Sequence, residues 1–329
     1  MSAMPHPYAN LTPDCMLDAV ESCGYRCDGR QLALNSFENR VYLVYLEEGA
    51  PLVAKFYRPE RWSDGAILEE HEFALELEAR EIPVVAPLRC NGRTLHEHAA
   101  YRFALYPRRP GRSPELENRE TLTWLGRFIA RMHAVGAMKR FAHRPAIDLE
   151  SFGSEPSRFV IENGFIPPDL SETYRTVVED VLSRVARCES RAGDVTTLRL
   201  HGDCHAGNIL WTEAGPHFVD LDDARTGPAV QDLWMCLSGD RRAMEMQLAA
   251  LIEGYREFYD FDPAELALIE ALRTLRMVHY AGWLARRWSD PAFPANFPFF
   301  NTQRYWQDHV LALREQAALL DEAPLELLL

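Results

Sequence analysis

The loop-like stretch Leu200–Leu210 holds the residue types that phosphoryl transfer requires. Asp203 and Asn208 fit the pattern His-Gly-Asp-x4-Asn, and Asp220 follows twelve residues after Asn208, behind an apolar pair. Transfer of a phosphoryl group to a hydroxyl needs a carboxylate that orients and deprotonates the acceptor, together with oxygen ligands for magnesium. We therefore predict Asp203 as the catalytic base and Asn208 and Asp220 as magnesium ligands. Asp220 is also predicted to be a catalytic residue.

The alternative interpretation is an ordinary loop with polar caps, whose acidic side chains face solvent. A lone Asp-x4-Asn would carry little weight, but here it lies between apolar runs and an apolar-Asp pair follows it. One amide oxygen and one carboxylate make a poor zinc site. They make a good partial shell for magnesium, whose other ligands would be phosphates and water.

Lysine is scarce in this chain, which draws attention to where it occurs. Of the 35 basic residues only Lys55 and Lys139 are lysines, and the others are arginines. Lys55 falls within the apolar segment Pro51–Tyr57, which is typical of a buried strand. A compact ammonium suits a site that a guanidinium would not fit. The alternative for Lys55 is an exposed position on the strand.

These residues need elements that bring them together, and the first hundred residues predict a small α+β unit. Alternating apolar residues and turn signals predict three antiparallel strands, a helix capped by Ser63 or Asp64, and two further strands. The expected strands are Gln31–Leu34, Val41–Leu46, Pro51–Tyr57, Val84–Leu88 and Tyr101–Tyr106, and the expected helix is Ser63–Arg80.

The rest of the chain has a helical character after a linker at Pro107–Arg112. Helical periodicity begins around Leu122, and an Asp262-capped segment opens a later helix. Further helices are expected at Ser171–Cys188 and Arg241–Tyr259, and a hairpin with a Gly-Pro turn at Asn208–Trp211 and His217–Val219. The boundary between a mostly β N-terminal lobe (1–108) and a mostly helical C-terminal lobe (109–329) is therefore expected near residue 108.

Composition excludes some classes of partner. The formal net charge of −14 argues against nucleic acid and anionic membranes, because both require a basic face. The start of the sequence lacks the basic and apolar pattern of an export signal. The seven cysteines are scattered, and the one close pair, Cys23 and Cys27, lacks a nearby partner for a zinc site. We expect reduced thiols in a cytoplasmic protein.

The loop motif resembles the catalytic loop of the aminoglycoside phosphotransferase and choline kinase superfamily. The apolar-Asp pair at Asp220 is similar to the metal motif of that superfamily. The wider chain, from Gln31 to about Trp306, resembles the bacterial stress response kinase A group. The segments that carry this closer resemblance are Asn35–Tyr42, Ile67–Leu75, Val219–Arg225 and Gly227–Trp234.

The resemblance implies roles for residues of the N-terminal lobe. Lys55 would bind the α and β phosphates of ATP, and a helix glutamate would pair with it. Glu69, Glu70 and Glu72 compete for that place, and Glu70 is chosen because its spacing to Leu77 matches the superfamily. Ser36 would contact ATP from a turn that contains no glycine. In that turn, Asn39 is expected to be able to adopt a left-handed conformation.

Other residues near the motif are left with two interpretations each. His201 and His205 are expected to orient the loop rather than to act as acids or bases, and Asp232 resembles a brace for the loop. Asp222 and Asp223 face either the acceptor or solvent. The aromatic residues between Trp283 and Trp306 are expected to pack together rather than to form a binding platform.

The resemblance implies a protein-kinase-like two-lobe α+β fold and an enzyme that transfers the γ-phosphoryl group of ATP with Mg²⁺. The expected acceptors are serine and threonine hydroxyls of proteins in a bacterial stress response, and the expected state is a monomer. One alternative is a small-molecule kinase that acts on an amino alcohol or an aminoglycoside. A catalytically inactive scaffold is a second alternative, against which Lys55, Asp203, Asn208 and Asp220 argue.

Overall fold

The computed structural model describes residues 6–327, and these residues form two compact units. Of the described residues, unit 1 combines 6–115 with 141–144 and 203–224, and unit 2 combines 116–140, 145–202 and 225–327. The predicted lobe boundary near residue 108 stays a prediction. All the site residues expected from the sequence belong to unit 1.

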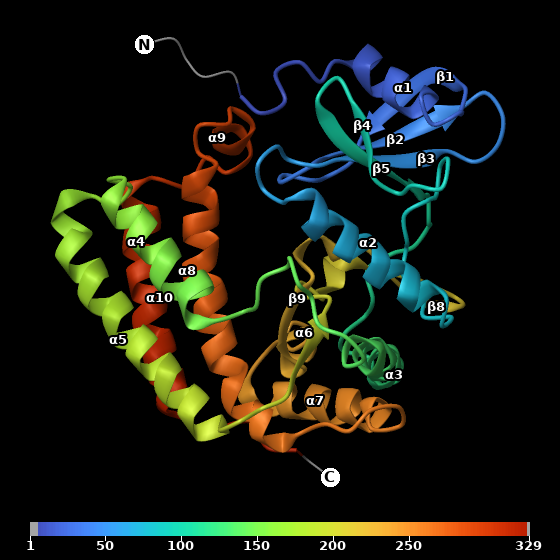
Figure 1. The fold of residues 1–329 in the computed structure, drawn as a ribbon. Coiled ribbons are helices and arrows are strands. Elements are labelled where there is room, and N and C mark those ends of the chain that lie inside the picture. The colour runs from blue at the N-terminus through green and yellow to red at the C-terminus, as the bar shows by residue number, and fades with distance from the viewer. Residues whose placement is uncertain (1–5, 328–329) are drawn as a thin grey trace. The chain divides into compact units, whose positions relative to one another are not determined.

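Unit 1 is built on a five-stranded antiparallel sheet in the order β1-β2-β3-β5-β4 (Figure 1). A second small sheet in this unit is the hairpin β7-β8. Its helices and strands are α1 (Pro13–Glu21), β1 (Cys27–Ala33), β2 (Arg40–Leu46), β3 (Leu52–Phe56), α2 (Asp64–Glu78), β4 (His96–His98), β5 (Tyr101–Pro107), η2 (Ala206–Asn208), β7 (Ile209–Thr212), β8 (Gly215–Phe218) and η3 (Leu221–Asp223).

Helices α1 and α2 lie on opposite faces of this sheet (Figure 1). Because side chains alternate along a strand, β3 serves both faces. Ala54 and Phe56 pack in one core cluster with Met16 and Val20 of α1. Lys55 points the other way, towards the face that α2 covers, where its ammonium meets Glu70. Strand β3 thus contributes apolar side chains to one face and a buried ammonium to the other.

The prediction of a strand at Val84–Leu88 is wrong. Only Val84 forms an isolated bridge, to Phe218, and the fourth strand of the sheet is the short β4. Pro83 and Pro87 lack an N–H donor, so this segment has too few donors for a strand ladder. The N–H of Val85 donates to the carbonyl oxygen of Phe218, and that of Leu88 to the carbonyl oxygen of Leu105.

Other predicted elements differ in detail. The helix predicted at Ser63–Arg80 is α2, and Ser63 is its N-cap. The Gly-Pro pair of the hairpin lies inside β8, where Gly215 pairs with Thr212, so the prediction of a Gly-Pro turn is wrong. Helix α1 was not expected from the sequence, although Thr12 caps it and Pro13 occupies its first position.

Unit 2 is mostly helical, and β6 and β9 form its one small sheet among the described residues. In Figure 1, α4, α5, α8 and α10 run side by side. Its elements are α3 (Arg119–Gly136), the π-helical turn η1 (Glu150–Ser154), α4 (Glu155–Glu162), α5 (Pro168–Ala192), β6 (Thr197–Leu200), β9 (Arg225–Pro228), α6 (Val230–Trp234), α7 (Arg241–Tyr255), η4 (Pro263–Leu268), α8 (Ile269–Arg286), α9 (Ala292–Asn296) and α10 (Gln303–Asp321).

Two glycines let α3 and α7 pack backbone against backbone. A Cβ atom on Gly126 would lie 2.0 Å from the carbonyl oxygen of Leu251, and one on Gly254 would lie 2.0 Å from that of Thr123. Neither distance leaves room for a side chain, so both positions require glycine. The close approach places His133 of α3 beside Tyr255 of α7, with 2.8 Å between the imidazole Nδ1 and the phenol oxygen.

The aromatic residues near the C-terminus mostly pack together, as expected. Trp306 and Phe300 are buried, and their ring centres lie 5.7 Å apart. Trp283 contacts Phe293 edge to face, with 5.1 Å between ring centres. Within residues 6–327, no helix has the length and apolar character needed to cross a membrane.

Candidate active site

The residues of the His-Gly-Asp-x4-Asn motif are held to one another by local hydrogen bonds. The amide of Asn208 donates to the backbone carbonyl of Asp203 at 2.9 Å and to its Oδ2 at 3.3 Å. His205 caps η2, and its Nδ1 accepts a hydrogen bond from the N–H of Gly207 at 2.9 Å. Its Nε2 lies 3.4 Å from Asp203 Oδ2. Asn208 and His205 therefore both orient the carboxylate of Asp203.

Asp220 stands at the end of the β7-β8 hairpin in an unusual backbone conformation. Its φ of 60° is left-handed, a region where Asp is more common than most residues. The N–H of Val219 donates to the carbonyl oxygen of Asn208 at 3.0 Å, which ties the two ends of the hairpin. As a result Asn208 and Asp220, twelve residues apart in sequence, line the same cavity. Strained backbone of this kind is often found at functional sites.

Lys55 is buried among three carboxylates of unit 1. Its Nζ lies 3.0 Å from Asp220 Oδ1, 3.1 Å from Asp222 Oδ1 and 3.4 Å from Glu70 Oε1. Of the three helix glutamates that competed for Lys55, Glu70 is the one in contact with it. Glu72 is exposed, and Glu69 bonds elsewhere. The ammonium is buried, and it is compact enough to contact all three acids at once.

These buried charges shift one another's pKa values. Burial alone lowers the pKa of Lys55, but Asp220, Asp222 and Glu70 outweigh it and hold the pKa well above its ordinary value. Burial raises the pKa of Glu70, against the opposing effect of Lys55. Burial also acts to raise the pKa of Asp222, but Arg61 and Lys55 reverse this and lower it. Lys55 is therefore a cation, and Asp222 a carboxylate, at neutral pH.

Two arginines that were not singled out from the sequence complete this charge cluster. Arg61 forms ion pairs with both Asp222 and Asp223. The guanidinium of Arg144 lies 3.6 Å from Glu70 Oε2 and donates to the backbone carbonyls of Asp222 and Ala224. In a chain with 33 arginines their type is no signal, and only the fold distinguishes them from the rest.

The two carboxylates that follow Asp220, those of Asp222 and Asp223, form ion pairs within unit 1. Asp222 is buried between Lys55 and Arg61, so the prediction that it faces the acceptor or solvent is wrong. The reason is its position in η3, which turns its side chain towards the two cations. Asp223 is partly exposed and pairs with Arg61.

Glu69 holds the segment that carries Arg144. Its two carboxylate oxygens accept hydrogen bonds from the backbone N–H groups of Ala142, His143 and Arg144, at 2.6 to 3.0 Å. Helix α2 therefore presents adjacent glutamates with separate tasks. Glu70 meets the lysine, and Glu69 fixes the backbone of the arginine that also contacts Glu70.

The turn between β1 and β2 carries Ser36. Its hydroxyl donates to the carbonyl oxygen of Asn39 at 3.3 Å, and its side chain lines the cavity described next. Asn39 does not use the left-handed conformation that it was expected to be able to adopt, because its φ is not positive. Asn39 is buried, and its Oδ1 accepts a hydrogen bond from the N–H of Arg58 at 3.0 Å. Its amide therefore braces the turn from inside.

A cavity of about 530 Å³ within unit 1 brings most of these residues together. Its volume lies in the range of small-molecule sites, and its walls are largely apolar with a few polar groups, as such sites are. The apolar lining includes Leu32, Val41, Val53, Val85 and Leu210, and the polar lining includes Ser36, Lys55, Glu70, Asn208 and Asp220. Five of the six predicted site residues thus share one cavity. The sixth, Asp203, does not line it but contacts Asn208.

The cavity suits a nucleotide with a divalent cation. Apolar side chains from β1, β2 and β3 offer surfaces for a base, and Lys55 offers a cation for phosphates. The cation's ligands would be the carboxylate of Asp220 and the amide oxygen of Asn208, both hard oxygen donors of the kind that Mg²⁺ prefers. The exposed carboxylate of Asp220 remains accessible although it also pairs with Lys55.

The backbone immediately before Asp203 is fixed within unit 2 by Asp232, a fully buried acid of α6. Its carboxylate accepts hydrogen bonds from the N–H groups of His201 and Gly202, both at 2.9 Å. His133 Nε2 approaches the same carboxylate at 3.1 Å. Gly202 has a φ of 82°, which favours glycine at this turn. Asp232 is thus the brace of the loop that was expected.

A buried lysine of a five-stranded antiparallel sheet pairs with a helix glutamate, and an Asp-x4-Asn loop leads into a hairpin that ends at Asp220. These features are typical of a phosphotransferase of protein-kinase-like fold. The chain belongs to the phosphotransferase enzyme family, whose APH model matches residues 30–269.

It is a homologue of stress response kinase A of Escherichia coli (strain K12), with 47% identity over 320 residues and 97% of each chain covered. The same identity and coverage hold for the serine/threonine protein kinase RdoA of Salmonella typhimurium (strain LT2).

Solved structures of distant relatives have the same fold. The amicoumacin kinase hAmiN, in complex with AMP-PNP, Ca²⁺ and its ligand, superimposes with a TM-score of 0.70 at 19% identity, with 93% of each chain covered. A microcompartment-associated aminopropanol kinase superimposes with a TM-score of 0.68 at 16% identity, covering 92% of this chain and 95% of that one. At these identities the likeness shows the fold alone.

Proposed function

We propose that this protein is an ATP- and Mg²⁺-dependent kinase that phosphorylates serine and threonine hydroxyls of proteins in a bacterial stress response. One arrangement supports the phosphoryl transfer. The ammonium of Lys55 contacts Glu70 and Asp220 at the wall of a cavity that Asn208 also lines. The protein acceptor is supported by the 47% identity to kinases of that kind along nearly the whole chain. The cytoplasmic location and the monomeric state remain predictions.

Each proposed role follows from a position in unit 1. Lys55 binds phosphate oxygens of ATP, and Glu70 holds the lysine in place from α2. Ser36 contacts the nucleotide from the β1-β2 turn. Asn208 and Asp220 would hold Mg²⁺, which neutralises charge on the phosphates when it is bound.

Asp203 acts on the acceptor. Its carboxylate, oriented by Asn208 and His205, accepts the proton of the acceptor hydroxyl. The acceptor oxygen forms a bond to the γ-phosphorus as the bond from that phosphorus to the β–γ bridging oxygen breaks. The products are a phosphate ester and ADP. Such positioned bases are usually worth about 10²–10⁴-fold in rate.

The competing proposal is a small-molecule kinase for a cationic amino alcohol or aminoglycoside. A cationic acceptor would need carboxylates that are not already paired with cations of the protein. Asp222 and Asp223 were the candidates, but both are paired with Arg61, and Asp222 also with Lys55. This pairing disfavours the competing proposal.

Labelled ATP with magnesium tests the choice of acceptor. The purified protein is incubated alone, with a bacterial lysate, and with choline, homoserine or kanamycin, and label is followed separately into protein and small molecules. We expect label on serine or threonine of proteins, and none in reactions with Asp203→Asn. Turnover of a small molecule with no labelled protein, the enzyme itself included, would establish the small-molecule alternative.

Thermal shifts separate the proposed roles of the two aspartates. Asp203→Asn should lose rate but keep the rise in melting temperature that magnesium adds to ATP, because Asp203 holds neither ligand. Asp220→Asn should lose both rate and that magnesium-dependent rise. The reverse pattern would show that the two assignments must be exchanged.

A further inference from the structure

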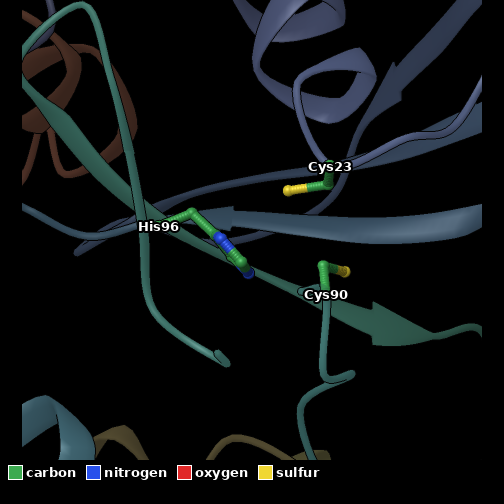
Figure 2. Close-up of side chains that lie close together, drawn as sticks. All are labelled: Cys23, Cys90 and His96. Atoms are coloured by element: carbon green, nitrogen blue, oxygen red, sulfur yellow. The ribbon is translucent and has the colours of Figure 1, made fainter. Parts of the chain in front are cut away.

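Three side chains with soft or intermediate metal-binding atoms meet in unit 1 away from the candidate active site. Cys23 follows α1, Cys90 lies in the loop before β4, and His96 is the first residue of β4 (Figure 2). Their ligand atoms all lie within 4.8 Å of one another. None of the three lines the active-site cavity. No spacing motif indicates this group, because Cys90 is 67 positions after Cys23 in the chain.

The surroundings leave these atoms available as ligands. The Nε2 atom of His96 is buried and has no hydrogen-bond partner among the residues that the structure describes. Cys90 is buried, with the Tyr25 hydroxyl 4.0 Å from its sulfur, and Cys23 is half-buried. A buried ring nitrogen without a partner usually costs free energy, and a bound cation would remove that cost.

The protonation states of the three side chains at neutral pH allow a metal to bind. Burial lowers the pKa of His96, so its imidazole is neutral, which is the form that binds metals. Burial raises the pKa of Cys23 to about 11, and the nearby Cys90 adds to the increase. Without a cation this thiol keeps its proton. A divalent cation binds the thiolates and releases the thiol protons to solvent, so affinity should rise with pH.

We propose that Cys23, Cys90 and His96 form a binding site for a thiophilic divalent cation such as Zn²⁺. Two thiolates and one imidazole are a ligand set that zinc accepts, with water in the fourth tetrahedral position. Zinc–sulfur bonds of about 2.3 Å require the ligand atoms to approach by roughly 1 Å from their present separations. Cys23 lies in the turn that ends α1, where a movement of that size disturbs no strand.

The bound cation would fasten α1 to the loop and strand at the β4 edge of the sheet. Met16 and Val20 of α1 already share a core cluster with Cys90. A cation held from both sides adds a cross-link to this apolar contact, and it stabilises the folded state because the site exists only there. This role is independent of phosphoryl transfer.

Metal content and optical spectra test the site without any activity assay. Reduced protein is incubated with ZnCl₂, passed through a desalting column and analysed for zinc, and a second sample is titrated with Co²⁺. We expect about one zinc per chain, a thiolate-to-cobalt charge-transfer band, and a rise of roughly 5 °C in melting temperature with zinc in 100-fold excess over its Kd.

Matched variants identify the ligands. Cys23→Ser, Cys90→Ser and His96→Gln should each reduce bound zinc to below about a tenth of an equivalent and remove the cobalt band. Cys27→Ser and His98→Gln serve as controls and should bind like the wild type, because Cys27 lies four positions after Cys23, at the start of β1, and His98 lies on β4 with His96. Should Cys90→Ser fail to fold, the less buried Cys23 and His96 decide the question.

Three results would overturn the proposal. One is the absence of zinc binding by the reduced wild type. Another is zinc that the three ligand variants retain. The third is a Cys23–Cys90 disulfide that forms under a mild oxidant in a protein that binds no zinc when reduced, which would make the pair a redox-active dithiol instead.

Discussion

Two buried acidic centres of this protein, one in each unit, are stabilised in different ways. In unit 1, Glu70 and Asp222 are surrounded by the cations Lys55, Arg61 and Arg144. In unit 2, Asp232 is held by two backbone N–H groups and the neighbouring His133. A buried carboxylate needs either cations or hydrogen-bond donors, and these two centres use one solution each.

The difference matches what each centre does. Backbone donors have fixed positions, so Asp232 is suited to hold the turn before Asp203 in a single conformation. Side-chain cations can exchange partners, and Lys55 contacts three carboxylates at once. Such a centre is suited to bind phosphates, because the lysine can contact a phosphate oxygen and still keep some of its carboxylate contacts. The comparison teaches that a carboxylate held by backbone donors serves as a fixed brace, whereas one held by side-chain cations belongs to a charge cluster that can rearrange.

The largest effect should come from Lys55. Lys55→Met leaves three carboxylates without their shared cation, and we expect a rate loss of about 10²–10³-fold, together with a loss of stability of about 3–5 kcal/mol. Lys55→Arg should also impair catalysis, because the broad guanidinium does not fit the space that the ammonium fills among the three carboxylates. Kinetics and urea unfolding measure both effects. The control is Lys139→Arg, at the only other lysine, which is exposed. Activity of Lys55→Arg within twofold of wild type would contradict the assignment.

A comparable loss of stability is expected at Asp232. Asp232→Ala leaves the N–H groups of His201 and Gly202 unsatisfied in a buried place, which should cost about 3–5 kcal/mol. Asp232→Asn keeps one acceptor and should cost about half as much. Chemical unfolding checks this, with Asp240→Asn as the matched control. Asp240 caps α7 from the surface, where Asn is an equally good cap. Equal stability of Asp232→Asn and Asp240→Asn would argue against the brace.

Substitution of Glu69, Glu70 and Glu72 of α2 by glutamine should lower kcat/KM by different amounts. Glu70→Gln removes one charged partner of Lys55, and we expect about 10–100-fold lower kcat/KM. Glu69→Gln weakens the hold on the backbone of Arg144 and should cost about fivefold. Glu72→Gln, at an exposed position, should remain within twofold of wild type and is the built-in control. If Glu72 ranked first, the pairing of Lys55 with Glu70 would have no functional meaning.

The smallest effect is a pH dependence of stability that comes from Glu265, a buried acid that contacts the start of α6. Glu265 accepts a hydrogen bond from the N–H of Val230, and burial raises its pKa from 4.5 to about 7. Between those values the folded state holds a proton that the unfolded state has released, so stability falls as pH rises. From pH 5.5 to 8 we expect a loss of about 2 kcal/mol.

Glu265→Gln should not show this loss, because its side chain stays neutral. The free energy of unfolding is measured for variant and wild type at pH 5.5 and at pH 8. The loss between the two pH values is then compared between the two proteins. Glu179→Gln, on the exposed face of α5, is the control and should follow the wild type. A parallel pH dependence of Glu265→Gln and wild type would show that Glu265 titrates normally.

Local patterns in the sequence predicted many of the elements. Alternating apolar residues placed β2, β3 and β5 within two residues of their observed bounds, and capping residues located the start of α2 and of the turn η4. The predicted strand at Val84–Leu88 failed because apolar content alone does not provide hydrogen-bond donors, which Pro83 and Pro87 lack. Helix α1 went unnoticed because its buried face is short.

Residue type and spacing were enough to select Asp203, Asn208 and Asp220, because a loop and a hairpin relate them locally. Lys55 was found through its rarity. Arg61, Arg144 and the group of Cys23, Cys90 and His96 have no such signal, since arginine is common here and the three ligands are far apart in the chain. Their partners were set by the packing of α1, α2 and the sheet. Spacing along the chain reports only local geometry, and contacts between distant segments exist only once the apolar layers have closed around them.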